Sequence, residues 1–158
     1  MNNVASPRET VVKIRPMAEA DLGLVIALEE QIFSDPWPAS SFRELLDNDQ
    51  WGALVAELDG GIIGYACYMI VLDEAHLTNI AVIPDYRRKS VAQQLLDRIL
   101  WIVNKDNCEL LLLEVRPSNE AAIRFYKKHQ FAELYRRPNY YRRPVEDALV
   151  MVRYLRTD

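Results

Sequence analysis

The sequence lacks long hydrophobic runs and contains little histidine or cysteine. No apolar stretch approaches the roughly 20 residues that a membrane-spanning helix needs, and the polar start MNNVASPRET has no apolar core typical of a secretion signal. Only two histidines and two cysteines are present, and Cys67 and Cys108 do not have the spacing of metal ligands. We therefore expect no metal site, no membrane contact and a reduced, cytoplasmic location in which both thiols are free and buried.

A strong excess of charge of one sign is also absent. The formal net charge is −4, and 27% of the residues are charged, which gives no global attraction to nucleic acid. Internal repeats, linkers and low-complexity tracts are missing as well. We expect a single domain over residues 1–158, frayed at residues 1–9, that is a monomer or a weak dimer.

Glycine is missing from a basic turn where it would be useful. The stretch AVIPDYRRKSVAQQLL, residues 81–96, runs from a strand through the turn into a helix. Turns that hold phosphate at a helix N-terminus usually contain glycine, which lets backbone N–H groups approach the anion closely. By pattern alone, this turn is either a phosphate cradle or an ordinary solvated turn.

Hydrophobic periodicity predicts seven strands and four helices in the order β-α-α-β-β-β-α-β-α-β-β. Strands are expected near 10–17, 51–58, 61–72, 74–83, 109–115, 131–137 and 146–155, and helices near 18–33, 40–46, 91–105 and 118–129. The Asp59-Gly60-Gly61 turn predicts a hairpin. Ser40 or Ser41 is expected to cap the second helix, and Ser118 or Asn119 the fourth. The segments 77–115 and 110–135 are expected to be right-handed crossovers between parallel, paired strands.

Two side chains are candidates for acid–base chemistry. Glu114 ends the strand ELLLLEV, which we expect to be buried on both faces, and partial removal from water would suit it to a general base. It could equally reach solvent or pair with Arg116. Tyr126 lies on the same helical face as Asn119, and such a tyrosine is usually part of the core. Together, however, Glu114 and Tyr126 could be a base and an acid on either side of one cleft.

Two long motifs resemble the GNAT superfamily of acetyl-CoA-dependent N-acetyltransferases. They are LTNIAVIPDYRRKSVAQQLL and LLLEVRPSNEAAIRFYKKHQF. The motifs DPWP, VLDEAHLTNIAV and NYYRRPVEDALVM are similar, more narrowly, to bacterial RimI-type enzymes, which acetylate the N-terminal alanine of a small-subunit ribosomal protein. The resemblance implies an α/β fold with a seven-stranded, mostly antiparallel sheet, a central splayed parallel strand pair, and helices on both faces.

The resemblance also implies an acetyl-CoA site, because the family pairs the backbone of one strand with the pantetheine arm and places the pyrophosphate on the following turn. The implied cofactor-binding residues are Ile80, Ala81, Val82, Arg87, Arg88, Lys89, Ser90, Val91, Ala92, Gln93, Asn119 and Tyr126. Ser90 departs from the family pattern, which has glycine there. We expect a helical or bridge-region φ at Ser90 and usable CoA binding.

In the family, the residues that match Glu114 and Tyr126 are the general base and the acid that protonates the departing thiolate. The resemblance places the acceptor peptide between the FSDPWP and RRPNYYRR segments, with Trp37, Tyr140 and Tyr141 as walls. A protein α-amine has a pKa of about 8, against about 10.4 for lysine, so a modest carboxylate suffices as the base. The expected substrate is the N terminus of a ribosomal protein starting with Ala or Ser.

Two other functions remain open at this point. The chain could acetylate a small amine such as an aminoglycoside or a polyamine, or it could be a catalytically silent acyl-CoA-binding module, for which Ser90 is the best argument. The acidic residues Asp35, Asp73 and Glu74 could attract a basic peptide. A basic cluster is either a solvated face or an anion contact; it comprises Arg136, Arg137, Arg142 and Arg143.

Overall fold

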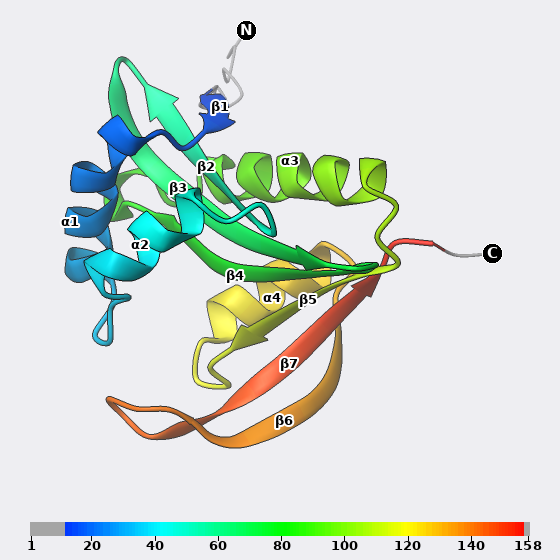
Figure 1. The fold of residues 1–158 in the computed structure, drawn as a ribbon. Helices are drawn as coiled ribbons and strands as arrows, with labels where there is room; N and C mark the ends of the chain where they lie inside the picture. Colours follow the sequence, from blue (N-terminus) through cyan, green and yellow to red (C-terminus); the bar gives the residue numbers. More distant parts are fainter. Residues whose placement is uncertain (1–11, 157–158) are drawn as a thin grey trace, which may run out of the picture.

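The computed structural model describes residues 12–156, and the predicted fraying of residues 1–9 lies outside this range. Figure 1 shows a curved sheet with helices on both sides. The strands are β1 Lys13–Pro16, β2 Trp51–Leu58, β3 Gly61–Val71, β4 Glu74–Val82, β5 Leu110–Val115, β6 Ala132–Tyr141 and β7 Glu146–Tyr154. The helices are α1 Leu22–Ile32, α2 Ala39–Leu46, α3 Val91–Lys105 and α4 Glu120–Lys128, with short 3₁₀ turns at Glu19–Asp21 and Pro84–Tyr86. The predicted order of strands and helices is confirmed.

The seven strands form one sheet in the order β1-β2-β3-β4-β5-β7-β6. Among the strands of residues 12–156, β4 and β5 are the parallel pair and the other neighbours are antiparallel. The predicted fold class is therefore confirmed. The expected pairing of the strands within residues 110–135 is wrong, because β7 folds back from β6 and lies between β6 and β5.

The parallel pair is splayed, as the family resemblance implied. Its register runs from Glu74 opposite Leu110 to Leu77 opposite Leu113 and then stops, although β4 continues to Val82. Backbone groups on the second half of β4 therefore face an opening instead of a strand. This opening separates the two halves of the sheet (Figure 1).

Helices cover both faces because alternate residues of a strand point to opposite sides. In β2, Ala53 and Val55 pack with α1 and α2, whereas Leu54 and Ala56 pack in the cluster that contains α3 and α4. The helix predicted over residues 91–105 is confirmed as α3, and its buried face consists of Val91, Leu95, Leu96, Ile99, Leu100 and Val103. Two hydrophobic cores thus hold the sheet from either side.

Of the predicted hairpin turn and the two predicted helix caps, the turn and one cap are confirmed. Asp59 and Gly60 form the β2–β3 turn with φ of 51° and 81°, the left-handed pair that a two-residue hairpin requires. Asn119 caps α4, since its side chain accepts the N–H of Ala122 at 3.1 Å. The predicted serine cap of α2 is wrong: the helix begins at Ala39, directly after Pro38, which has the extended conformation of an N-cap (φ −61°, ψ 149°).

Burial of β5 differs between its two faces. Leu111, Leu113 and Val115 are buried, whereas the alternate residues Leu110, Leu112 and Glu114 are only half-buried. The expectation of burial on both faces is therefore wrong. The second face is partly open because β4 diverges from β5 and no helix of residues 12–156 closes the space in front of Glu114.

Two further expectations concern the state of the thiols and the absence of a membrane-spanning helix. Cys67 and Cys108 are buried and unpaired, as predicted. No helix within residues 12–156 is long and apolar enough to cross a membrane.

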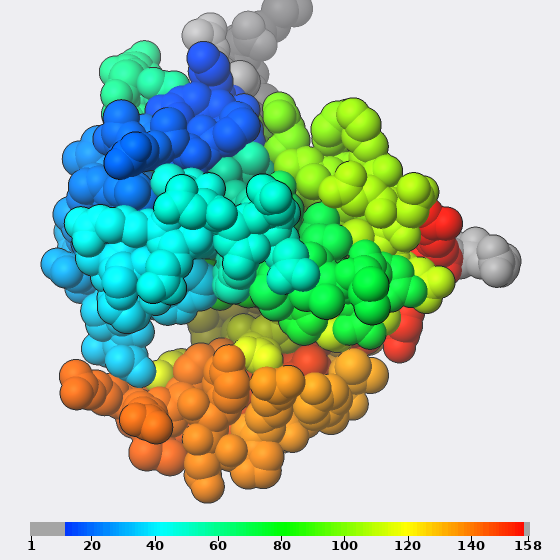
Figure 2. All heavy atoms as spheres, viewed as in Figure 1, coloured from blue at the N-terminus to red at the C-terminus, as the bar shows by residue number. Residues whose placement is uncertain are grey.

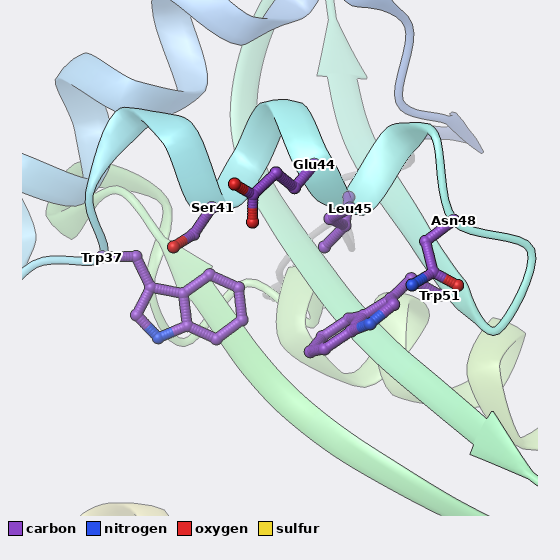
Figure 3. Close-up of a pocket in the computed structure, with 6 residues that line it drawn as sticks. All are labelled: Trp37, Ser41, Glu44, Leu45, Asn48 and Trp51. Atoms are coloured by element: carbon purple, nitrogen blue, oxygen red, sulfur yellow. The ribbon is translucent and has the colours of Figure 1, made fainter.

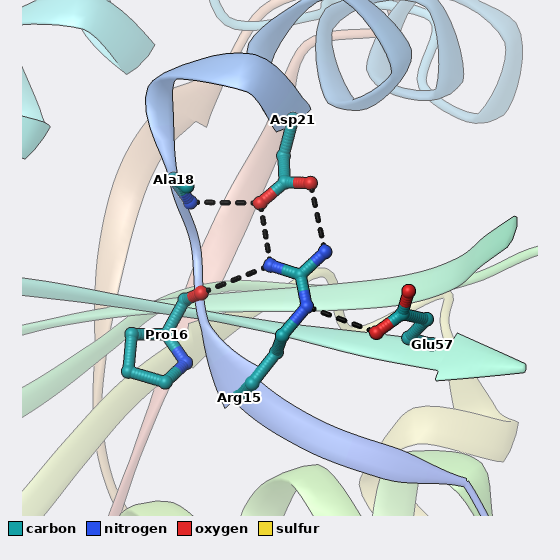
Figure 4. Close-up of polar contacts among 5 residues, drawn as sticks. All are labelled: Arg15, Pro16, Ala18, Asp21 and Glu57. Atoms are coloured by element: carbon teal, nitrogen blue, oxygen red, sulfur yellow. Dashed lines mark hydrogen bonds and ion pairs between the residues drawn. The ribbon is translucent and has the colours of Figure 1, made fainter. Parts of the chain in front are cut away.

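A charged network joins β1 to the start of α1 (Figure 4). Arg15 binds both carboxylate oxygens of Asp21, at 2.7 and 2.9 Å, and its Nε donates to Glu57 on β2 at 3.0 Å. Asp21 also accepts the N–H of Ala18 at 2.7 Å. The hydrogen bonds from Arg15 lower the pKa of Asp21. This network fixes the direction in which α1 leaves the edge of the sheet.

Candidate active site

A cavity of about 520 Å³ lies between the α1–α2 loop, the β4–β5 pair and the β6–β7 hairpin. Figure 2 shows the surface hollowed between the blue and cyan N-terminal helices and the orange hairpin. The lining residues are Phe33, Ser34, Asp35, Trp37, Trp51, His76, Leu77, Thr78, Leu113, Glu114, Arg116, Tyr140 and Tyr141. The structure thus brings the predicted base and all three predicted wall residues into one cavity.

Glu114 enters this cavity from the carboxyl end of β5. Its side chain is 25% exposed, and Oε1 lies 3.2 Å from a guanidinium nitrogen of Arg137. Glu114 does not pair with Arg116, so that alternative from the sequence is wrong. Arg116 instead donates to the carbonyl of Pro144 at 2.9 Å and lies 3.4 Å from Glu146. An ion pair with a half-exposed arginine orients the carboxylate and leaves it reachable from the cavity.

Two tyrosines form the wall that the hairpin contributes. The rings of Tyr140 and Tyr141 are nearly perpendicular, with centroids 5.0 Å apart, and the Arg116 guanidinium lies 4.3 Å from the centroid of the Tyr141 ring. Burial and the neighbouring Glu114 carboxylate raise the pKa of Tyr140 to about 12. Burial also raises the pKa of Tyr141. Both phenols are therefore uncharged near neutral pH, and the wall is aromatic without adding an anion.

The opposite wall comes from the α1–α2 loop. The Trp37 ring packs against Phe42, with centroids 5.4 Å apart, and meets Trp51 edge-on at 6.1 Å. Ser34 Oγ donates to the carbonyl of Arg143 at 3.0 Å, which connects the loop to the hairpin. The FSDPWP and RRPNYYRR segments therefore lie opposite each other across the cavity, as expected.

Glu29 on α1 is a buried carboxylate that the sequence analysis missed. Its side chain accepts hydrogen bonds from the Tyr65 hydroxyl, from Asn79 Nδ2 at 3.0 Å and from the backbone N–H of Trp37 at 3.2 Å. Glu29 is only 2% exposed. It therefore links α1 to β3, to β4 and to the aromatic wall.

A sequence signal for Glu29 was present. It lies seven residues after Leu22 and four after Val25, and both of these are buried on the same helical stripe. A carboxylate on an apolar stripe must find buried donors, because an unpaired charge there is costly.

Backbone groups along one side of β4 face the splayed opening. The N–H of Ile83 donates to the carbonyl of Ile63 at 2.9 Å, so it points toward β3. Since successive backbone groups of a strand alternate in direction, the N–H of Val82 points away from β3, as does that of Ile80. Ala81 is turned toward β3. Of the three residues predicted to pair with a pantetheine arm, Ile80 and Val82 have their backbone groups in the opening.

The basic turn contains two non-glycine residues in the left-handed region. Arg88 and Ser90 both have φ of 63°, and Ser90 has ψ of 13°. The prediction of a helical or bridge-region φ at Ser90 is wrong. The turn keeps the backbone conformation that glycine favours, so α3 still begins at Val91 with its first N–H groups available for an anion. The side chain of Ser90 makes no capping hydrogen bond, and Arg87 Nε donates to the carbonyl of Val82 at 3.1 Å.

Tyr126 is not among the residues that line the cavity. It is 7% exposed and packs against Phe125 and Phe131, with ring centroids 5.4 and 5.6 Å away. It belongs to the cluster of Leu113 and Val115, whose side chains point to the other face of β5 from Glu114. Burial raises the pKa of Tyr126, so the phenol retains its proton near neutral pH.

Comparison with known proteins agrees with this geometry. The model of the Acetyltransferase (GNAT) family matches residues 23–131. A Bacillus subtilis protein is 38% identical over 144 residues, which cover 90% of this chain and 95% of that protein. The chain belongs to the GNAT acetyltransferase family.

Similarity to a protein of Escherichia coli K12 and to an E. coli crystal structure relates this GNAT chain to a narrower group. A protein named ribosomal protein bS18-alanine N-acetyltransferase is 34% identical over 142 residues, covering 87% of this chain and 94% of that protein. The crystal structure of the E. coli ribosomal-protein-S18-alanine N-acetyltransferase has a TM-score of 0.87 at 31% identity, covering 94% of this chain and 96% of that one. The chain is therefore an N-acetyltransferase. The prediction of an enzyme is confirmed, and the alternative of a catalytically silent module is not.

GNAT enzymes take their acetyl group from acetyl-CoA, which is thus the cofactor of this chain. The residues present fit such a group. The backbone N–H groups of Ile80 and Val82 are directed to the opening, and the α3 N-terminus follows a turn with Arg88 and Lys89. A positive helix end with basic side chains is a suitable site for a pyrophosphate.

Proposed function

We propose that this GNAT enzyme acetylates the N-terminal α-amine of ribosomal protein bS18, or of a similar protein that starts with Ala or Ser. The observation that carries the proposal is the cavity that joins Glu114 to aromatic walls from the α1–α2 loop and the β6–β7 hairpin. A passage with a wall on either side suits an extended peptide end. The names of the relatives support the same acceptor.

In this proposal Glu114 is the general base. The α-amine of a protein has a pKa of about 8, so near neutral pH a carboxylate can remove its proton, directly or through one water. The arriving ammonium group competes with Arg137 for Glu114, because both are cations that seek the same oxygens. The ion pair thus holds the carboxylate in place until the acceptor enters.

The remaining steps fall to residues on either side of the β4–β5 opening. The bound cofactor supplies the thioester that the free amine attacks. The N–H of Val82 is directed to the opening and can stabilise the charge that develops on the acetyl oxygen. Tyr126 keeps its proton near neutral pH and serves as the acid for the departing sulfur. The turn of Arg87–Gln93 and the amide of Asn119 hold the cofactor.

The test is acetylation of the organism's own bS18 by the purified enzyme, followed by intact mass and fragment analysis. We expect the mass of one acetyl group to be added at the α-amine. Matched samples contain bS18 whose α-amine is chemically blocked, and the small amines spermidine and kanamycin. Acetylation of the small amines with none on bS18 would establish the alternative function instead. We further propose that residues 1–158 act as one domain in the cytoplasm, where ribosomal proteins are made.

A further inference from the structure

A second cavity of about 260 Å³ adjoins the first beneath α2. Its lining residues are Trp37, Ser41, Glu44, Leu45, Asn48 and Trp51 (Figure 3). Trp37 and Trp51 also line the large cavity, so the two spaces share an aromatic wall. A peptide that follows the large cavity therefore has this second space within reach of one of its side chains.

The helical part of the lining is one face of α2 and its continuation. Glu44 and Leu45 lie three and four residues after Ser41, and Asn48 lies four and three residues after them, which places all four on the same side of the helix. In Figure 3 the Ser41 hydroxyl and the Glu44 carboxylate lie on the Trp37 side, and Asn48 lies near Trp51. The two indoles are 6.1 Å apart at 85°.

The chemistry of this space selects for a cation. Glu44 is the one carboxylate among the lining residues, and within residues 12–156 it forms no ion pair. Indole faces attract ammonium and guanidinium groups, and a nearby carboxylate adds an ion pair. The Ser41 hydroxyl supplies an oxygen that can accept a further N–H group of a guanidinium, whereas Asn48 Oδ1 already accepts the backbone N–H of Gln50 at 3.0 Å. An acidic side chain would be repelled by Glu44.

We propose that the cavity beneath α2 is a subsite for a basic side chain, preferentially arginine, of the acceptor protein a short distance after its N terminus. This inference rests on the proposed function, since it assumes a peptide in the large cavity. Arginine fits better than lysine because its planar group stacks on an indole while its N–H groups reach a carboxylate. The subsite makes the enzyme choose among proteins that start with the same residue.

Peptides with one variable position test the subsite. Each starts with Ala, is otherwise neutral and carries a single arginine, which is moved along the chain one position at a time. In matched peptides the arginine is replaced by citrulline, a neutral side chain of nearly the same shape. At one position we expect kcat/KM to be about fivefold higher with arginine than with citrulline. This ratio corresponds to the energy of one cation–π contact together with an exposed ion pair.

Two variants complete the experiment. In Glu44→Gln the arginine preference should fall below about twofold through a higher peptide KM, with the acetyl-CoA KM unchanged. Glu30→Gln removes the same charge from an exposed part of α1 outside both cavities and should keep the preference. Equal rates for arginine and citrulline at every position, or a preference that survives Glu44→Gln, would overturn the subsite. If none of the Ala-starting peptides is acetylated, the proposed function itself fails.

Discussion

At the scale of single residues, Glu114 carries the acid–base chemistry. Glu114→Gln should lower kcat/KM about a hundredfold, because the amide cannot accept the amine's proton, and should change the low-pH side of the rate profile. Tyr126→Phe keeps the ring packing against Phe125 and Phe131 and should lower kcat while CoA affinity stays within a few-fold. Steady-state rates with a bS18 peptide and CoA titrations measure both. Unchanged turnover in both variants would remove these two roles.

Ser90 shows what replaces glycine in the basic turn. A non-glycine residue at φ of 63° carries a strain of about 1 kcal/mol. Ser90→Gly should therefore raise the free energy of unfolding by about 1 kcal/mol, measured by urea denaturation. Ser40→Gly is the matched control: the same substitution within α2, where φ is helical, should lower stability by roughly 0.5 kcal/mol.

CoA affinity of the Ser90→Gly variant decides how the turn is used. Its N–H donors belong to the backbone and already have the geometry that glycine provides, so affinity should change less than tenfold. A gain of more than tenfold would mean that serine compromises the cradle.

At the scale of elements, α1 positions the aromatic wall through Glu29. Glu29→Gln replaces an acceptor oxygen by a donor against Tyr65, Asn79 and Trp37, so stability should fall by about 1–3 kcal/mol. The peptide KM should rise more than the acetyl-CoA KM, since the Trp37 loop is loosened. Glu30→Gln on the exposed side of α1 should change neither quantity. Equal rises in both KM values would contradict a positioning role and indicate general loosening.

The β1–α1 connection gives a pH-dependent test. The pKa of Asp21 is lowered in the folded state, mainly by the hydrogen bonds from Arg15. Its contribution is therefore complete above the unfolded pKa of about 4 and is lost as the pH falls through the folded value. Asp21→Asn should cost about 2 kcal/mol at pH 7 and less at pH 3, measured by urea denaturation. A cost at pH 3 as large as at pH 7 would exclude this linkage.

Most elements could be predicted because local signals and burial agree. The periodicity of α3 and the Asp59-Gly60 turn each point to the structure found. The errors arise where tertiary contacts decide. The strand β7 takes the place beside β5, and the open face of β5 depends on where β4 diverges, which no local pattern encodes. The φ of Ser90 is imposed by the turn into α3 and overrides the preference of serine.

At the scale of the whole molecule, the site is made from segments far apart in the sequence. Trp37, Glu114, Tyr140 and Tyr141 could be singled out because they match family motifs. The sequence could not single out Arg137 as the partner of Glu114, because four arginines lie in the same segment. The position of Tyr126 on the other face of β5 likewise follows from the packing of α4. A motif supplies the residue types, and the fold decides which of them meet.

The central claim is that the acceptor's α-amine reaches Glu114 between the two aromatic walls. A crystal structure with a bisubstrate analogue, in which CoA is joined to the N-terminal nitrogen of a bS18 peptide, tests it directly. We predict that this nitrogen lies within hydrogen-bonding reach of Glu114, directly or through one water, and that the peptide runs between Trp37 and Tyr140. A peptide that leaves the β4–β5 opening by another route, with its nitrogen remote from Glu114, would contradict the account.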